Sequence, residues 1–581
     1  MKKINILTFA VLLLSVFMVT SCGLKKMIKK YNTVKYETAP NPLETHGQKI
    51  KVAIKGSIPE KYFHKKAKVV FTPVLKYEGG SKTLKSITLK GEKAEGDGLV
   101  MKNKTSNTFA YDDVIDYTPA MNKSQLVVNA KAILKKKEVD LGEVKLADGV
   151  IYTSERIGKG ENILPNPPHG YEKEVIVNKT ANIYFQQNLF ALDMNQPYNK
   201  KAENIAALKD LNDFLQNGWK IRNIDINAWA SPEGEETYNQ NLSDNRSKTA
   251  QKYLNDAIAK LTKEWAKANK TFQPNISMNL SAKGEDWDGF VKAISASNMT
   301  DKGAILNVVN SQPDKTKREQ EIRNMAVIYK EIEDNTLPAL RRAEITIYSY
   351  TPKKTDEQIA LLSTTKPDSL DNKEILYAAT LTQDINTQLK IFKNATIVFP
   401  QDWRGYYSAS SACIKLKMID EAATYLEKAN SLSPNNPAVL NSLGVLAAWN
   451  KDYAKAEELY KSAQAAGATE NYNFAPINIH KGDYPAALNN MTGKTCDYNL
   501  ALAQLMTNDK DAALKTLECT EKDAPAYYLM AIIGARMNNT TILNDNLRKA
   551  VAADATLKAQ AKDDAEFIKF YGDTEFQNIV R

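Results

Sequence analysis

The amino-acid sequence predicts a multidomain protein with an all-β sandwich near the N-terminus, an α+β domain in the middle and an all-α solenoid at the C-terminus. Short apolar stretches separated by turn residues indicate the sandwich. A strand–loop–helix pattern indicates the middle domain, and a rhythm of 34 residues indicates the helical repeats. A chain of 581 residues with 43% hydrophobic residues is long enough for three or four packed domains.

The predicted organisation has the following parts in chain order. They are a signal peptide at 1–21, a lipid anchor and tether at 22–47, the β-sandwich at 48–160, the α+β domain at 175–350 with a helical insertion at 255–338, a linker at 351–371, and helical repeats at 372–581.

The first residues predict export and lipid attachment. Lys2 and Lys3 precede an apolar run over 4–19, which is typical of a secretory signal and too short to span a membrane. The four residues that end at Cys22 match the bacterial lipobox, whose cysteine receives acyl chains such as palmitate. We therefore predict that Cys22 attaches the protein to the outer membrane. An ordinary signal peptide with an incidental cysteine is the alternative.

The residues after Cys22 favour the periplasmic face of that membrane over the cell surface. Surface-exported lipoproteins of Bacteroidota often carry an acidic run at this place, and none stands here. Instead the segment is basic, with Lys25, Lys26, Lys29 and Lys30. Such lysines either contact anionic head groups, at roughly 1 kcal/mol each, or belong to a solvated tether.

Composition excludes several classes of function. The net charge of +10 is spread over 78 basic and 68 acidic residues, so it does not indicate nucleic-acid binding. The sequence shows neither a nucleophile elbow nor a complete P-loop, so we predict no enzyme activity and no cofactor. Cys413, Cys496 and Cys519 are too few for a disulfide framework. We expect buried small residues, with pairing of Cys496 and Cys519 in an oxidising periplasm as the alternative.

The predicted sandwich consists of short strands and carries no catalytic cluster. Val69–Thr72 and Leu126–Ala132 are β-rich runs, and a turn lies at Glu78–Ser81. The Pro-rich stretch Leu164–Pro168 marks its boundary. The histidines lack metal-ligand spacing, so we predict no metal site. A docking or spacer module is the interpretation.

The middle domain centres on residues 221–254. Ile224, Ile226 and Ala228 alternate with polar residues, which predicts a half-buried strand. A loop with Pro and Gly follows, and a helix then begins. The helix carries the pattern Y-N-x-x-L-S-x-x-R over 238–246, which resembles the OmpA-like peptidoglycan-binding domain. Segments 181–185 and 340–345 resemble the opening and closing strands of that family.

This resemblance implies a ligand site for the diaminopimelate of peptidoglycan. In the family an arginine grips a carboxylate, and an aspartate holds the ammonium end. Arg246 matches the arginine, whereas Ser231 stands at the aspartate position and Glu233 two residues beyond. The implied ligand residues are Arg246, Ser231, Glu233 and Asn239. The alternative for Arg246 is a helix-surface residue that pairs with Glu233, Glu235 or Asp244.

The predicted insertion contains Gly284–Phe290, a segment with three acids. Their spacing does not fit a calcium-binding EF-hand loop. We expect a helix start, with acids near its positive end.

The C-terminal residues predict about six helical hairpins. Pro400 and Pro434 lie 34 positions apart, and alanines recur with the same spacing. The alanines are Ala422 and Ala429, then Ala456 and Ala463. The pattern resembles the tetratricopeptide repeat, which implies a solenoid with a protein-binding concave face.

Together these features predict a lipid-anchored periplasmic adaptor that touches the cell wall through the OmpA-like domain and partner proteins through its repeats. Resemblance in architecture suggests an envelope assembly or secretion complex. The alternative is a pure protein-binding scaffold whose OmpA-like domain has lost peptidoglycan binding. The sequence does not distinguish the partner or the oligomeric state.

Overall fold

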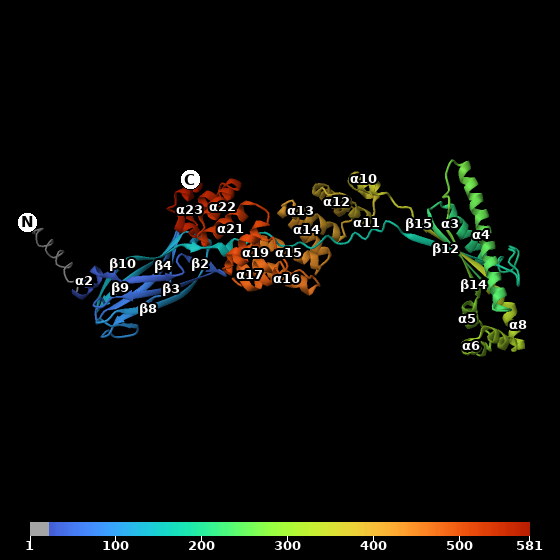
Figure 1. Cartoon of the computed structure of the whole chain (residues 1–581), viewed down its shortest axis with the longest axis horizontal. Helices are drawn as coiled ribbons and strands as arrows, with labels where there is room; N and C mark the ends of the chain where they lie inside the picture. Colours follow the sequence, from blue (N-terminus) through green and yellow to red (C-terminus); the bar gives the residue numbers. More distant parts are fainter. Residues whose placement is uncertain (1–21) are drawn as a thin grey trace, which may run out of the picture. The chain divides into compact units, whose positions relative to one another are not determined.

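The structure is a computed structural model that describes residues 22–581, apart from the side chains of Cys22 and Ala326. The predicted signal peptide at 1–21 lies outside this range. The chain divides into two compact units (Figure 1). Unit 1 combines the N-terminal part, up to Pro168, with residues from Thr382 to Arg581, and unit 2 is His169–Leu381. Unit 2 is therefore inserted in the sequence of unit 1.

The N-terminal part of unit 1 consists of two β-sheets (Figure 1). The first has the order β1-β3-β2-β11, with β8 also paired to β3. Its strands are β1 (Lys35–Ala39), β2 (Leu43–His46), β3 (Lys49–Ile58), β8 (Asn107–Asp116) and β11 (Val150–Ile151). The second has the order β10-β9-β4-β6-β7, with β5 paired to β4. Its strands are β4 (Lys68–Tyr77), β5 (Gly80–Thr83), β6 (Ile87–Gly91), β7 (Leu99–Met101), β9 (Ser124–Leu134) and β10 (Lys137–Asp148).

Both sheets contribute to one hydrophobic core. Along β3 buried residues alternate with more exposed ones, as a strand with one face on the core requires. Phe71 of one sheet meets Phe109 of the other with ring centroids 5.3 Å apart. The prediction of a β-rich N-terminal region is therefore confirmed.

The predicted tether at 22–47 differs from what the structure contains. Helix α2 (Cys22–Lys29) is followed by η1 (Tyr31–Thr33) and by strands β1 and β2. Leu24 and Met27 are fully buried in the core of the β-domain. Their spacing of three residues places both on one face of a short helix. The β-domain therefore begins at the residue next to Cys22, and no free tether separates them.

Unit 2 contains a four-stranded sheet with the order β12-β15-β13-β14. The strands are β12 (Ile176–Tyr184), β13 (Ile221–Ala230), β14 (Met278–Glu285) and β15 (Arg342–Tyr350). Strand β13 is parallel to β14 and antiparallel to β15. Helices α3 (Ala202–Gln216) and α4 (Glu236–Lys267) pack on this sheet and share its core.

The predicted insertion at 255–338 has different boundaries in the structure. Helix α4 continues to Lys267, and β14 forms part of the central sheet. Polar residues interrupt the apolar alternation of β14, which hides it from a periodicity search. The inserted helices are α5 (Trp287–Ala296), α6 (Lys302–Ser311), α7 (Lys315–Arg323), α8 (Ala326–Asn335) and α9 (Leu337–Leu340). They surround a small core of their own.

The predicted linker at 351–371 is mostly helical. It contains α10 (Asp356–Thr365) and η4 (Pro367–Ser369), and α11 (Asn372–Ala378) and η5 (Ala379–Leu381) follow within unit 2. Thr355 and Asp371 each form a capping box, which starts a helix in a sequence that reads as polar. The repeats of unit 1 therefore begin after Leu381 rather than at 372.

The C-terminal part of unit 1 is all-helical, as predicted. Its described residues form five consecutive hairpins between α12 (Ile385–Val398) and a C-terminal segment of α23 (Leu557–Asp563), η6 (Ala565–Phe570) and α24 (Thr574–Val580). The hairpins pair α13 (Trp403–Lys415) with α14 (Ile419–Leu432), α15 (Pro437–Trp449) with α16 (Tyr453–Ala465), α17 (Phe474–His480) with α18 (Tyr484–Asn490), α19 (Tyr498–Met506) with α20 (Lys510–Glu518), and α21 (Ala524–Arg536) with α22 (Thr540–Ala553). Within residues 22–581, no helix is long and apolar enough to cross a membrane.

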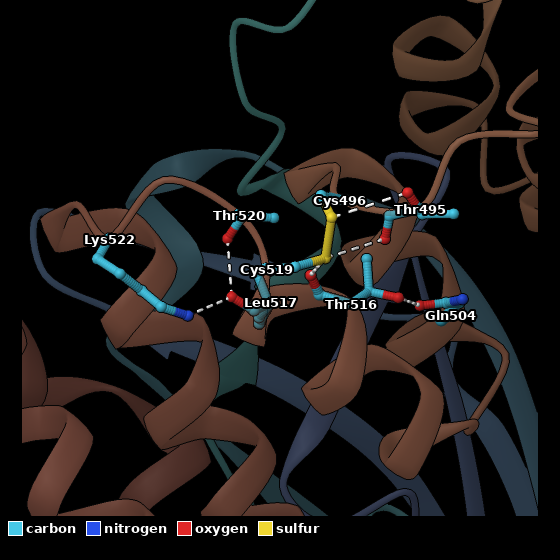
Figure 2. The surroundings of a disulfide bond; sticks show 8 residues. All are labelled: Thr495, Cys496, Gln504, Thr516, Leu517, Cys519, Thr520 and Lys522. Atoms are coloured by element: carbon cyan, nitrogen blue, oxygen red, sulfur yellow. Dashed lines mark hydrogen bonds between the residues drawn. A yellow bond between two sulfur atoms is a disulfide. The ribbon is translucent and has the colours of Figure 1, made fainter.

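The cysteines of the repeats differ from the expectation of buried small residues. Cys413 is buried in α13, as expected, but Cys496 and Cys519 form a disulfide. Figure 2 shows that this bond joins the loop before α19 to the end of α20. Both residues are exposed.

Candidate functional sites

An extended segment of the same chain lies against one face of the helical repeats. We call this face, which is contacted on α13, α15, α19 and α21, the groove. We call residues 152–168 the strap. It follows β11, and in Figure 1 it is the cyan trace along the helices of unit 1. After the short turn η3 (Thr153–Glu155) the strap has no regular secondary structure. Its contacts lie on α21 first and on α13 last, so it runs opposite to the order of the hairpins.

Three asparagines hold the strap by its backbone. Asn499 of α19 accepts from the N–H of Gly158 at 2.8 Å and donates to its carbonyl at 3.0 Å. Asn473, just before α17, accepts from the N–H of Asn162 at 2.7 Å and donates to its carbonyl at 2.9 Å. Asn441 of α15 donates to that same carbonyl at 2.9 Å. These amides replace the partners that a neighbouring β-strand would supply.

The three asparagines are almost completely buried, with exposed fractions of 1–2%. A buried amide needs partners for its N–H and C=O groups. Asn473 also donates to the side-chain oxygen of Asn441 at 3.0 Å, which links two hairpins. The strap therefore completes hydrogen bonds that the folded repeats would otherwise lack.

Side chains of the strap make further contacts. Glu161 accepts from the indole N–H of Trp449 at 2.6 Å. Burial raises the pKa of Glu161 above its ordinary value, because the charged form loses solvation.

Nearer the C-terminal end of the groove, Arg156 pairs with Asp564 and lies over the ring of Tyr528 at 4.6 Å. Tyr407 donates to the carbonyl of Leu164 at 2.6 Å.

Glycine is required at two positions of the strap. A Cβ on Gly158 would come within 2.7 Å of the ring of Tyr498. A Cβ on Gly160 would come within 2.7 Å of the hydroxyl of Tyr472. That hydroxyl is held in place because it donates to Asp497 at 2.6 Å. The groove therefore accepts only glycine at these places.

A second contact joins the β-domain to the repeats. The turn between β2 and β3 meets the turn between α17 and α18, where Gly47 approaches the backbone of Lys481 too closely to carry a Cβ. Beside it, His46 forms a hydrogen bond of 2.7 Å with the hydroxyl of Tyr484.

An ion-pair bridge joins the same two parts of unit 1. Arg536 bridges Glu44 of β2 and Glu566 of η6, at 2.6 Å to each. The strap thus belongs to a larger interface within unit 1.

The predicted ligand residues of unit 2 form a second cluster. Ser231, Glu233 and Asn239 lie in the loop after β13 and the first turns of α4, and all are buried. Ser231 donates to Glu233, and Asn239 donates to the backbone carbonyl of Glu233 at 3.0 Å. Arg341, which no local motif assigns to the site, pairs with Glu233 at 2.8 Å.

Arg246 is fully buried beneath residues 185–190, so its interpretation as a helix-surface residue is wrong. Its guanidinium donates to three backbone carbonyls, those of Leu189 at 3.1 Å, Trp229 at 2.9 Å and Gln186 at 3.0 Å. Burial, followed by the nearby charge of Arg341, lowers the pKa of Arg246 to about 9. In this arrangement the guanidinium fork faces protein carbonyls rather than an open pocket.

The acids of the segment 284–290 have structural partners. Asp286 caps α5 by accepting from the N–H of Gly289 at 2.9 Å, as the sequence predicted for a helix start. Asp286 also pairs with Arg342. Glu285 accepts from the indole of Trp287 at 2.8 Å and from Asn239 at 3.1 Å.

Solved structures resemble parts of this chain, with low TM-scores. A tetratricopeptide repeat protein from Parabacteroides merdae ATCC 43184 is 14% identical with a TM-score of 0.29, over 36% of this chain and 90% of that chain. PilW, a widely conserved type IV pilus biogenesis factor, is 14% identical with a TM-score of 0.26, over 39% of this chain and 99% of that one. The pilF protein of Pseudomonas aeruginosa is 11% identical with a TM-score of 0.25, over 39% and 98%.

No protein-family model and no curated protein matches the sequence. The hairpins themselves therefore carry the description of the C-terminal region as tetratricopeptide-like. Helices α13 and α15 have the same length of 13 residues, and each packs against the helix that follows it. Their first residues, Trp403 and Pro437, lie 34 positions apart.

Proposed function

We propose that the protein is an exported, lipid-anchored adaptor of the outer membrane, which acts by binding other proteins. One observation carries the proposal. Asn441, Asn473 and Asn499 are arranged to hydrogen-bond the backbone of an extended polypeptide. A surface of this kind suits protein segments rather than small molecules. By resemblance in architecture, an envelope assembly or secretion complex is the setting that we infer.

Export is supported by the disulfide between Cys496 and Cys519. Exposed disulfides persist in oxidising compartments such as the periplasm and are rare where thiols are kept reduced. Lipid attachment is supported by the lipobox that ends at Cys22. The lipid would be attached at the first residue of α2, the helix whose Leu24 and Met27 are buried in the core of the β-domain.

The orientation towards the periplasm is part of the same proposal. The lysines of α2 are exposed beside Cys22, where they are able to face anionic head groups. They are Lys25, Lys26 and Lys29, followed directly by Lys30.

The anchor is tested by substituting its cysteine. Cys22→Ala is expected to abolish incorporation of labelled palmitate and to release the protein into the soluble fraction. Cys413→Ala, which changes a cysteine buried in α13, serves as the matched control and should keep both properties. A Cys22→Ala protein that is still labelled would exclude this attachment.

The adaptor function is tested by chemical crosslinking in cells that produce the full chain at its normal level. We expect recurrent crosslinks between lysines of residues 382–581 and one envelope protein. The adaptor function is contradicted if the experiment is sensitive enough to detect crosslinks within known complexes but finds only internal crosslinks for this chain.

The geometry of unit 2 favours a scaffold over a wall-binding domain. Three N–H groups of Arg246 already donate to carbonyls, and Glu233 is paired with Arg341. A diaminopimelate carboxylate would have to displace these bonds, which stabilise the fold by about 1.5–3 kcal/mol each where a charged group is involved. We therefore propose that the OmpA-like unit has no peptidoglycan ligand in this state.

Wall contact remains the second candidate, because Ser231, Glu233 and Asn239 are gathered at one loop. Sedimentation of the full chain with purified peptidoglycan distinguishes the scaffold function from wall binding. The scaffold proposal predicts that the wild type stays in the supernatant. Pelleting of the wild type that is lost in Arg246→Lys, but kept in the control Arg222→Lys on the exposed side of β13, would establish wall binding instead.

A further inference from the structure

The strap occupies the groove through contacts that another polypeptide could also make. Five hydrogen bonds between the asparagines and Gly158 or Asn162 involve only backbone atoms of the strap. Backbone groups are the same in every sequence, apart from proline. These bonds therefore supply affinity for any extended segment, and the pockets beside them supply specificity.

The specificity follows from the side chains around the strap. Tyr498 and Tyr472 leave no space for a Cβ at the positions of Gly158 and Gly160. The indole N–H of Trp449 requires an acceptor at the position of Glu161. Next along the strap, Ile163 packs against the small core around Val445, Tyr460 and Ile477.

We propose that the strap is a built-in, displaceable occupant of a peptide-binding groove, and that it keeps the groove closed until a partner segment replaces it. The partner segment is extended and carries two glycines two positions apart, then an acid directly after the second glycine, and an aliphatic residue two positions after the acid. The inference deepens the proposed adaptor function, on which it rests for its biological role, by naming the chemistry of the partner and the regulation of the site.

Covalent connection explains why the strap excludes free peptides. The strap is tied to β11 at one end and continues into unit 2 at the other. A tethered segment acts at an effective concentration of the order of millimolar, which disfavours a free competitor by roughly 10²–10⁴-fold. A partner therefore needs either a tighter sequence or additional contacts elsewhere on the protein.

The test uses the full chain and a fluorescent synthetic peptide of residues 152–168. In the variant Gly158→Val/Gly160→Val the strap of the chain itself (the cis strap) no longer fits beside Tyr498 and Tyr472, whereas the groove is unchanged. We expect this variant to bind the peptide at least 100-fold more tightly than the wild type does. Asn166→Val, at an exposed position of the strap, is the matched control and should behave as the wild type.

The site of binding is checked by adding Asn473→Ala to the double-valine variant. Loss of peptide binding, with an unchanged circular dichroism spectrum, is the expected result. The inference is overturned if the wild type binds the peptide as tightly as the valine variant does. It is also overturned if the folded valine variant does not bind, or if Asn473→Ala leaves binding intact.

A second measurement covers the case in which the valine variant does not fold. Hydrogen exchange of the wild-type chain is followed with and without millimolar ¹⁵N-labelled peptide 152–168. Faster exchange at Gly158 and Asn162 of the cis strap supports displacement, and unchanged exchange shows that the strap is a permanent part of the fold. These peptide experiments use no cellular partner, so their outcome does not depend on the adaptor function. Peptide binding would stand even if crosslinking found no partner. Conversely, a crosslinked partner would still support the adaptor function if the peptide did not bind.

Discussion

At the scale of single residues, side-chain amides take the place of a β-strand. Asn473 and Asn499 each offer one acceptor and one donor to a single strap residue, which is the pattern of an antiparallel hydrogen-bonded pair. Because these amides are buried, an unpaired donor or acceptor would cost about 1–3 kcal/mol. The strap and the repeats therefore stabilise each other.

This predicts that Asn473→Ala loosens the strap. The N–H of Asn162 loses its acceptor, and its carbonyl keeps only the bond from Asn441. We expect faster cleavage by a lysine-specific protease after Lys159, which is exposed within the strap. Asn489→Ala, at an exposed position of α18, should leave the cleavage rate unchanged. Equal rates for the two variants would contradict the role of Asn473.

Arg246 shows how a residue type that suggests a ligand site also serves the fold. Its three bonds to carbonyls join the segment 186–189 to the end of β13. Arg246→Ala would leave three buried carbonyls without these donors. We expect the free energy of unfolding of unit 2 to fall by roughly 3 kcal/mol or more, measured by urea denaturation. The exposed Arg222→Ala should change it by less than about 0.5 kcal/mol.

The sequence identified the residues of this cluster but not their pairing. The motif that contains Asn239 and Arg246, and the loop with Ser231 and Glu233, do lie together in the structure. The partner of Glu233 is Arg341, more than 100 positions later. Only the pairing of β15 with β13 brings that arginine to the loop, and a local pattern does not contain this information.

At the scale of elements, regular segments could be predicted and the strap could not. Alternating strands and 34-residue hairpins leave a periodic trace in the sequence. The strap has neither period. Its Pro-rich end predicts only a boundary, which lies between Pro168 and His169. A signal was nevertheless present in the repeats: Tyr407, Asn441 and Tyr528 each stand at the fifth residue of the first helix of a hairpin, and all contact the strap.

Docking of the strap should depend on pH through Glu161. Burial raises its pKa in the folded state above the ordinary 4.5, so the folded state binds the proton more tightly than the unfolded state does. The free energy of unfolding should therefore gain a contribution as pH falls through the raised pKa towards 4.5, and lose it as pH rises. The free energy of unfolding is measured with urea at pH 5 and at pH 7. In Glu161→Gln the difference between the two values should lack this contribution.

A control distinguishes this effect from the titration of other groups. Glu427→Gln, on an exposed position of α14, should retain the pH dependence of the wild type. If Glu161→Gln and Glu427→Gln give the same pH dependence, Glu161 does not contribute.

The disulfide stabilises the hairpin that carries Asn499. It joins Cys496 and Cys519, which lie 23 positions apart in the sequence, and chain entropy predicts a stabilisation of about 3 kcal/mol. Hydrogen bonds such as Lys522 to the carbonyl of Leu517, at 2.6 Å, hold the end of α20 nearby (Figure 2). We expect Cys496→Ser/Cys519→Ser to unfold at lower urea concentration. Reduction should lower the wild-type midpoint similarly and leave the variant unchanged.

At the scale of the whole molecule, unit 1 is discontinuous in sequence. The β-domain, the strap and the repeats form one compact unit, although 213 residues of unit 2 separate the strap from the repeats (His169–Leu381). A linear division into a sandwich, an inserted domain and a solenoid assigns the right classes of structure to the two ends of the chain. It misses that the two ends share an interface, because contacts such as Glu44 with Arg536 are not encoded by local pattern.

The chain fills its own groove, and amide hydrogen exchange of the whole chain is a direct test of this arrangement. The N–H groups of Gly158 and Asn162 donate to buried asparagines, so we predict slow exchange at both. Exchange should accelerate at Asn162 in Asn473→Ala and at Gly158 in Asn499→Ala. Exchange of both amides at the rate of an unfolded chain in the wild type would contradict the account.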